Sequence, residues 1–152
     1  MKMQIIILFL TFISIFSVES YSLLGIELEV NGKTFQIKND EDEVKSYIYK
    51  TMSLGRIPQK YLDSMREILV DNQFKCKKKI FYSGGLYDAF YCPKKNEDFS
   101  SIKLSFKLNN TTVTLKEKQL FETRKDGNNY IKFRAQKETK ILFIPTKLLD
   151  DQ

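Results

Sequence analysis

Polar and apolar residues alternate along most of the chain after residue 20, which is typical of β-strands with one buried face. Residues 25–30 alternate apolar and acidic side chains, and residues 33–37 alternate again after Asn31-Gly32, a strong hairpin turn signal. Residues 102–108 alternate strictly, and a turn at Asn109-Asn110 leads back into residues 111–115. The pattern predicts two antiparallel hairpins.

Other strands are shorter or less regular. Residues 44–52 alternate imperfectly, and short strands are expected around residues 121, 130, 131 and 133, with a turn at 126–129. The apolar run 141–144 reads as a strand ended by Pro145.

One segment has helical periodicity. Pro58 suits the first position of a helix, and an apolar stripe with helical spacing follows it over residues 58–70. The stripe consists of Tyr61, Leu62, Met65, Ile68 and Leu69. Several hairpins and one helix predict a mainly β fold, with antiparallel hairpins in a sheet and one packed α-helix.

The first 20 residues read as a secretory signal peptide. Lys2 precedes an apolar run from residue 5 to residue 16, and Val18-Glu19-Ser20 offers a cleavage site after Ser20. A membrane anchor is the alternative, but the run is shorter than the roughly 18–20 residues that a spanning helix needs. No later segment predicts a stable membrane span. The expected product is therefore one domain, residues 21–152, secreted or in the lumen of the secretory pathway.

Cys76 and Cys92 are the two cysteines of the chain, and a secreted chain usually pairs them. Residues 80–82 and 86–91 favour strands, and a loop at 83–85 would pair residue 82 with 86 and so place residue 76 opposite 92. Such a bridge contributes roughly 3 kcal/mol in the chain-entropy model. A redox-active pair is the alternative, but the spacing is far from Cys-x-x-Cys.

The formal net charge of +6 would permit contact with acidic polymers or anionic membranes, but we favour the simpler explanation that lysine is the common solvating residue of this chain. Lys75 and Lys77-Lys78-Lys79 flank Cys76, and in a strand they alternate between faces instead of forming one patch. We therefore interpret this run as the protection of a strand edge. The basic residues do not interleave with aromatics over a defined groove, so no nucleic acid partner is expected.

The composition excludes several chemistries. With no histidine, the chain cannot form a Ser-His or Cys-His nucleophile pair or use histidine as a metal ligand. No metal site and no cofactor are expected, and no Gly-rich phosphate loop supports an enzyme of another kind. Asn109 and Asn110 are overlapping N-glycosylation acceptors, although the turn explains both asparagines without a glycan.

Residues 47–58, Tyr-Ile-Tyr-Lys-Thr-Met-Ser-Leu-Gly-Arg-Ile-Pro, resemble the second active-site segment of pepsin-like aspartic peptidases. In that family a hydrophobic strand runs into Asp-(Thr/Ser)-Gly-(Thr/Ser)-Ser-Leu, and a Pro then opens a helix. Matching Ser53-Leu54 and Pro58 to this frame puts Tyr49 at the catalytic Asp and Thr51 at the Gly.

The order of elements over residues 25–150 is similar to the C-terminal lobe of that family. Residues 101–109 resemble its Pro-x-Ile-x-Phe-x-Phe-x-Gly strand pair, and residues 114–121 resemble the Leu-x-x-x-x-(Tyr/Phe) segment. The first catalytic Asp and the flap have no counterpart, and the late Ile-Leu-Gly-Asp segment is reduced to residues 141–143 and 148–149. The resemblance implies a pepsin-lobe-like scaffold without a catalytic residue, because a phenol keeps its proton in neutral or acidic solution and Tyr49 cannot act as the base.

The leading hypothesis is a secreted, non-catalytic domain whose partner is unknown, with a protein or peptide as the candidate. An unrelated small secreted β-protein that acts as a binding or inhibitor module is the alternative. A psi-shaped loop at residues 49–54 that feeds the helix would favour the first hypothesis. A closed barrel or a cystatin-like sheet wrapped on one helix would favour the second.

Overall fold

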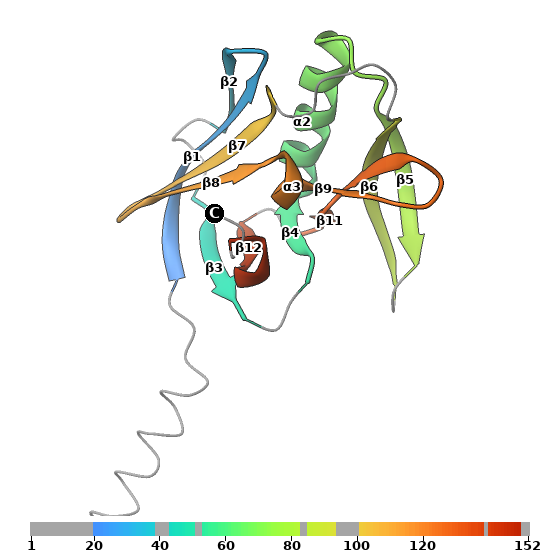
Figure 1. The fold of residues 1–152 in the computed structure, drawn as a ribbon. Helices are drawn as coiled ribbons and strands as arrows, with labels where there is room; N and C mark the ends of the chain where they lie inside the picture. Colours follow the sequence, from blue (N-terminus) through green and yellow to red (C-terminus); the bar gives the residue numbers. More distant parts are fainter. Residues whose placement is uncertain are drawn as a thin grey trace, which may run out of the picture.

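The computed structural model describes residues 20–38, 43–50, 53–82, 85–93, 101–138 and 140–149. These residues form a mainly β fold of two sheets, with one long helix between them (Figure 1). The predicted fold class is confirmed. Of the predicted signal peptide, residues 1–19 lie outside the described residues, and Ser20 is the first residue of β1.

The larger sheet has eight strands among the described residues. Its order along the sheet is β11 (Phe133–Gln136), β4 (Gly55–Pro58), β12 (Ile141–Pro145), β3 (Lys45–Tyr49), β1 (Ser20–Val30), β7 (Lys103–Leu108) and β8 (Thr112–Lys116), and β2 (Lys33–Lys38) also pairs with β1. The strand predicted over 44–52 is thus shorter, and Thr51 and Met52 lie outside the described residues.

Two hairpins of this sheet are those that the alternation predicts. Asn31 and Gly32 both have positive φ, 53° and 81°, which is the geometry of a type I′ turn and joins β1 to β2. In β7 the even-numbered Leu104, Phe106 and Leu108 are buried. The polar odd-numbered residues lie on the opposite face of the sheet, where they are exposed or half-buried.

The long helix is α2 (Gln59–Asp71). Pro58 ends β4 and is the N-cap, one residue before the helical position expected for it. The predicted stripe faces the core, since Tyr61, Leu62, Met65 and Leu69 are buried and Ile68 is half-buried. The helix contacts β2, β4, β11 and β6, so it joins the two sheets.

The smaller sheet has the order β5 (Lys77–Tyr82), β6 (Leu86–Pro93), β10 (Asn128–Ile131) and β9 (Phe121–Thr123). Tyr82 pairs with Leu86, as the three-residue loop predicts, and the register continues to Lys77 opposite Tyr91. Cys76 and Cys92 form a disulfide with their Cα atoms 4.1 Å apart, which confirms the predicted bridge.

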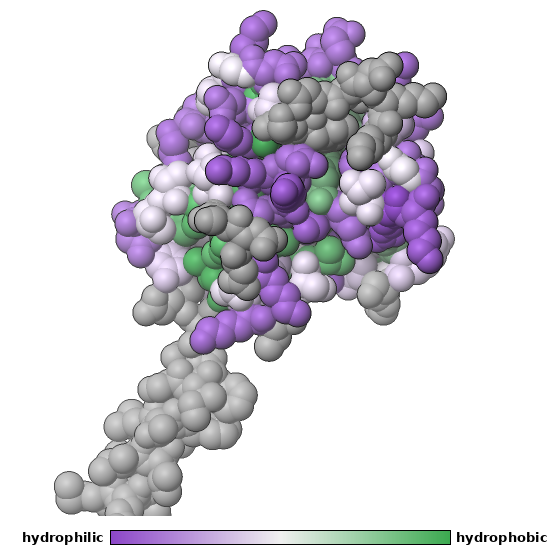
Figure 2. Space-filling model, viewed as in Figure 1, coloured by the Kyte–Doolittle hydropathy of each residue, from purple (hydrophilic) through white to green (hydrophobic). Residues whose placement is uncertain are grey.

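Short helical turns complete the described chain. They are α3 (Glu117–Leu120), between β8 and β9, and the 3₁₀ turn η2 (Thr146–Leu148), after β12. Polar side chains cover most of the face seen in Figure 2, with smaller apolar areas between them. No helix in the described part of the chain is long and apolar enough to cross a membrane.

Two strand pairs are parallel, which a reading of successive hairpins did not predict. β12 lies parallel to β3, and β11 lies parallel to β4. Parallel partners must come from distant parts of the sequence, because a crossover has to connect them. No turn signal marks such a pairing.

Candidate functional site

Tyr49 is the last residue of β3, at the point where the chain leaves the larger sheet. Opposite it on β12 is Pro145, and Ile48 lies opposite Ile144. The next described segment along the chain is Ser53-Leu54, which leads into β4 and then directly into α2. Tyr49 therefore lies at the end of the first strand of a strand–loop–strand–helix unit.

β12 is inserted between the two strands of this unit. It pairs in parallel with β3 and in antiparallel fashion with β4, where Phe143 faces Arg56. Two antiparallel strands joined by a loop, with a third strand between them, make a psi-shaped arrangement. The described residues place Tyr49 and Gly55 at the two ends of its loop.

The side chains at this strand end form an aromatic cluster. The ring centroids of Tyr49 and Phe143 are 5.2 Å apart, those of Tyr47 and Phe143 are 5.6 Å apart, and those of Tyr47 and Tyr49 are 6.3 Å apart. All three side chains are half-buried. The strand end Ile48-Tyr49-Lys50 carries no carboxylate, so the polar groups that this cluster presents are two phenol hydroxyls.

A cavity of about 610 Å³ adjoins Tyr47. Leu23, Val44 and Ile141 supply apolar walls, and Lys45 and Glu138 are among its charged lining residues. The cavity is therefore lined by both apolar and charged side chains.

Gly55 fixes the other end of the psi arrangement. A Cβ atom at this position would lie 2.3 Å from the ring of Phe133, its partner on β11. The Gly55 N–H donates to the carbonyl of Lys132 at 2.9 Å. The close approach of β4 to β11 therefore requires glycine here.

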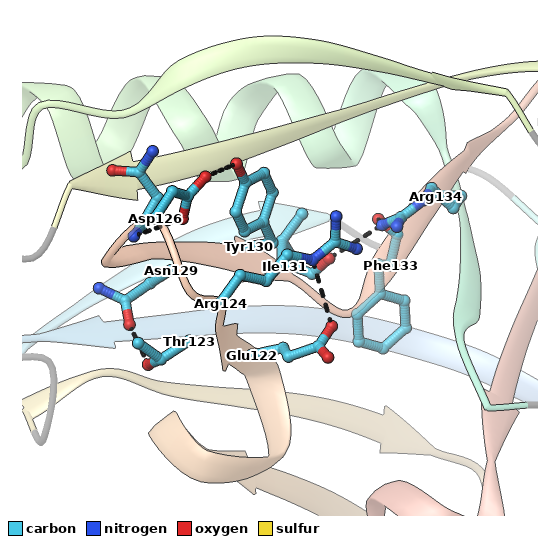
Figure 3. Close-up of polar contacts among 10 residues, drawn as sticks. Glu122, Thr123, Arg124, Asp126, Asn129, Tyr130, Ile131, Phe133 and Arg134 are labelled. Atoms are coloured by element: carbon cyan, nitrogen blue, oxygen red, sulfur yellow. Dashed lines mark hydrogen bonds and ion pairs between the residues drawn. The ribbon is translucent and has the colours of Figure 1, made fainter.

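A polar network on β9, β10 and the turn between them was not predicted (Figure 3). The Tyr130 hydroxyl donates to the Asp126 carboxylate, and the Asn128 N–H donates to it at 2.9 Å. These two hydrogen bonds hold the pKa of Asp126 below its usual value, and the bond to Asp126 raises the pKa of Tyr130. The Thr123 hydroxyl donates to Asn129 at 2.6 Å in the same network.

Arg134 on β11 is a buried cation. Its guanidinium donates to the carbonyl oxygens of Ile131 and Phe133 at 3.0 and 3.3 Å and lies 3.9 Å from the centre of the Phe81 ring. Burial, followed by the positive charges of Arg124 and Arg56, lowers the pKa of Arg134 to about 10. These contacts join the two sheets, so we assign Arg134 a structural role.

The remaining predicted sites lie apart from Tyr49. Asn109 and Asn110 are exposed in the turn between β7 and β8. The Asn109 side-chain oxygen accepts a hydrogen bond from the Ser22 N–H at 3.2 Å, and the backbone N–H of Asn109 donates to the Ser22 carbonyl at 3.0 Å. The described residues contain no group of three His, Cys, Asp or Glu side chains able to hold a metal ion.

No protein-family model matches this sequence, and no curated protein matches it. Among solved structures, the chain is similar to the crystal structure of basic 7S globulin from soybean, with a TM-score of 0.57 and 8% sequence identity. The match covers 86% of this chain and 33% of that one, so the chain spans about a third of the length of the globulin. At this identity the likeness is one of fold, and the fold of the globulin is pepsin-like.

Proposed function

We propose that this protein is a secreted, non-catalytic domain related to the C-terminal lobe of pepsin-like aspartic peptidases, with Tyr49 in the place of the catalytic Asp. On this proposal residues 1–20 are the signal peptide and residues 21–152 the mature domain. Its role is to bind a protein or peptide instead of hydrolysing one.

The psi arrangement at Tyr49 is the observation that carries the proposal. β12 lies between β3 and β4, and β4 runs directly into α2. This is the geometry expected if Ser53-Leu54 and Pro58 are the frame of an aspartic peptidase active-site segment. In the described part of the chain β11 and β8 are the two ends of the strand order of the larger sheet, and α2 also contacts β6 of a second sheet, which favours neither a closed barrel nor one sheet wrapped on a helix.

The chemistry at the strand end supports a binding role. Aspartic peptidases activate water with two carboxylates that share one proton. Tyr49 supplies none, and its ring packs on Phe143 instead of facing a partner carboxylate. A second copy of the chain would bring a second tyrosine, so self-association would not restore the pair.

The disulfide is compatible with export. Cys76–Cys92 bridges two buried cysteines, and such bridges persist in oxidising compartments. Asn110 is exposed in the β7–β8 turn, so a glycan there would leave the Ser22–Asn109 hydrogen bonds intact. A loss of mass on enzymatic deglycosylation of the secreted protein would establish this modification.

Peptide hydrolysis at acid pH tests the proposal, with pepsin as the positive control. We expect no cleavage by the wild type and none by Tyr49→Asp, because one carboxylate cannot replace the shared-proton pair. Cleavage by the wild type that a pepstatin-type inhibitor blocks would overturn the proposal.

An experimental structure tests the relationship independently of activity. Superposed on the C-terminal lobe of a pepsin-like enzyme, Tyr49 is expected to coincide with the catalytic Asp, and α2 with the helix that follows it. If Tyr49 lay elsewhere in the superposition, the domain would instead be an unrelated β-protein.

A further inference from the structure

Three large apolar side chains are exposed together at the end of the β5–β6 hairpin. The exposed fractions of Ile80, Tyr82 and Leu86 are 51%, 83% and 59%. Tyr82 pairs with Leu86 across the hairpin, and Ile80 lies two residues before Tyr82 on the same strand. Alternation along a strand therefore places all three side chains on one face, which we call the apolar tip.

The clustering is specific to this hairpin. Elsewhere in the described chain, the large apolar residues exposed to a similar degree are Leu24 on β1 and Val70 on α2, at 49% and 42%. They lie on different elements and do not extend the apolar tip. Single exposed apolar residues are common on protein surfaces, whereas a contiguous group indicates an interaction site.

Cationic side chains adjoin the apolar tip. Lys77, Lys78 and Lys79 precede Ile80 on β5, and all three are exposed. The expected alternation between two faces holds, and because these consecutive lysines are all exposed, solvent reaches both faces of β5 there. The lysines thus surround the base of the tip on both sides instead of forming one flat patch.

The cavity beside the tip has the same character. Ile80 and Leu86 line a cavity of about 470 Å³ together with Arg56 and Lys137. Asp88 and Glu138 also line it, and Asp88 accepts a hydrogen bond from Gln59 at 2.9 Å. A second cavity, lined by Ile80 and Tyr82, adds Arg66 and Asp63, so with the three lysines of β5 six cations and three carboxylates surround the tip.

The hairpin is held firmly while its end remains free. The Cys76–Cys92 disulfide closes its base, and β10 pairs with β6 near that base, at Tyr91 to Pro93. Figure 1 shows β5 and β6 at one side of the molecule, next to the β9–β10 hairpin. Because these contacts hold the base of the hairpin, its exposed apolar end can enter another phase without unfolding of the domain.

We propose that the apolar tip inserts into the interface of a lipid bilayer that contains anionic lipids, with Lys77, Lys78 and Lys79 against the headgroups. Apolar side chains bind to the acyl boundary and basic ones to the anionic leaflet, and tyrosine favours the level of the headgroups. A soluble polyanion would pair with the lysines but leave the apolar tip in water. The chain would lie on the membrane by this hairpin and not cross it.

Vesicle sedimentation tests the proposal. The protein is expressed from the full-length chain, and every variant has the same N-terminus. We expect binding to equimolar phosphatidylcholine–phosphatidylserine vesicles and much weaker binding to phosphatidylcholine alone. Ile80→Ser with Leu86→Ser should lower the partition coefficient about tenfold. Each of Lys77→Gln, Lys78→Gln and Lys79→Gln should lower it about fivefold, and added salt should weaken binding further.

Leu24→Ser and Val70→Ser are the matched controls, because they remove exposed apolar side chains outside the tip. They should bind as the wild type does. Equal losses in control and tip variants, or no preference for the anionic vesicles, would overturn the proposal. So would loss of binding in the lysine variants with none in the tip variant, which would indicate a polyanion surface.

Insertion itself can be followed by fluorescence, since the chain has no tryptophan. Tyr82→Trp should show a blue-shifted emission with anionic vesicles and quenching by lipids brominated on the acyl chain, whereas Val70→Trp should show neither. If Tyr82→Trp shifts on raising the protein concentration without lipid, the tip is a contact between copies of this chain and the membrane assignment is wrong.

Discussion

Gly55 is the residue at which the larger sheet leaves no room for a side chain. Phe133 is almost fully buried, and its ring occupies the space where a Cβ of residue 55 would be. Gly25, in β1, is different, since its nearest neighbours would lie 3.6 Å or more from a Cβ. Packing therefore requires glycine at position 55 but leaves room for a side chain at position 25.

Gly55→Ala is expected to lower the free energy of unfolding by about 1–3 kcal/mol, because Phe133 must shift out of a packed core. Gly25→Ala should be neutral or slightly stabilising. Urea denaturation of both variants measures the difference. Phe133→Leu should restore part of the loss in Gly55→Ala, and equal stability of the two alanine variants would contradict the steric explanation.

Asp126 makes the stability of the folded protein depend on pH in the acidic range. Its hydrogen bonds from the Tyr130 hydroxyl and the Asn128 N–H lower its pKa in the folded state. A carboxyl with a lowered folded pKa stabilises the protein above its unfolded pKa, and this contribution disappears as the pH falls through the folded value.

The variant Asp126→Asn keeps the shape of the side chain and removes the charge. Its Tm should lie below that of the wild type at neutral pH, and the two should converge in strong acid. Thermal unfolding followed by circular dichroism across this range measures the convergence. Glu67→Gln, at an exposed position of α2, is the control. The difference between its Tm and that of the wild type should change less between neutral pH and strong acid.

At the scale of elements, the β5–β6 hairpin depends on its covalent bridge. The hairpin reaches the core mainly through β6, whose Ala89, Phe90 and Cys92 are buried, while every described residue of β5 except Phe81 is exposed. A strand with so little burial gains little from packing, so its closure by Cys76–Cys92 carries more of its stability.

Cys76→Ala combined with Cys92→Ala is expected to lower the free energy of unfolding by roughly 3 kcal/mol, as the loop-closure model gives for a short loop. Amide exchange should accelerate most in β5 and least in β7. The wild type under reducing conditions should reproduce the effect. An unchanged urea midpoint would show that packing alone holds the hairpin.

At the scale of the whole molecule, β12 connects parts of the sheet that are distant in sequence. It separates β3 from β4 and supplies Leu142 and Ile144, both fully buried, and η2 adds the buried Leu148. Each such side chain contributes about 1.5–3 kcal/mol, and folded domains retain only about 5–15 kcal/mol in total.

A chain truncated after Glu138 is therefore expected not to fold, because β3 and β4 lose their common partner. Circular dichroism and the dispersion of amide proton resonances would report this. Truncation after Leu149, which removes none of the described residues, is the control and should remain folded. A truncated chain with native dispersion would show that β12 is dispensable.

The sequence by itself determined the features that depend on neighbours along the chain. The Asn31-Gly32 turn, the Tyr82–Leu86 register, the disulfide that follows from it and the stripe of α2 all come from turn chemistry and from periods of 2 or 3.6 residues. These signals are local, so they are legible without knowledge of the fold.

Tertiary structure alone decided which distant segments meet. The parallel pairs of β12 with β3 and β11 with β4, the burial of Arg134 and the contact between Gly55 and Phe133 join residues that no local pattern links. The sequence also did not predict the exposure of Ile80, because an apolar residue in a strand is expected in the core until its neighbours are known. Packing between strands is a property of surfaces brought together by folding, and one strand's sequence does not encode its partner.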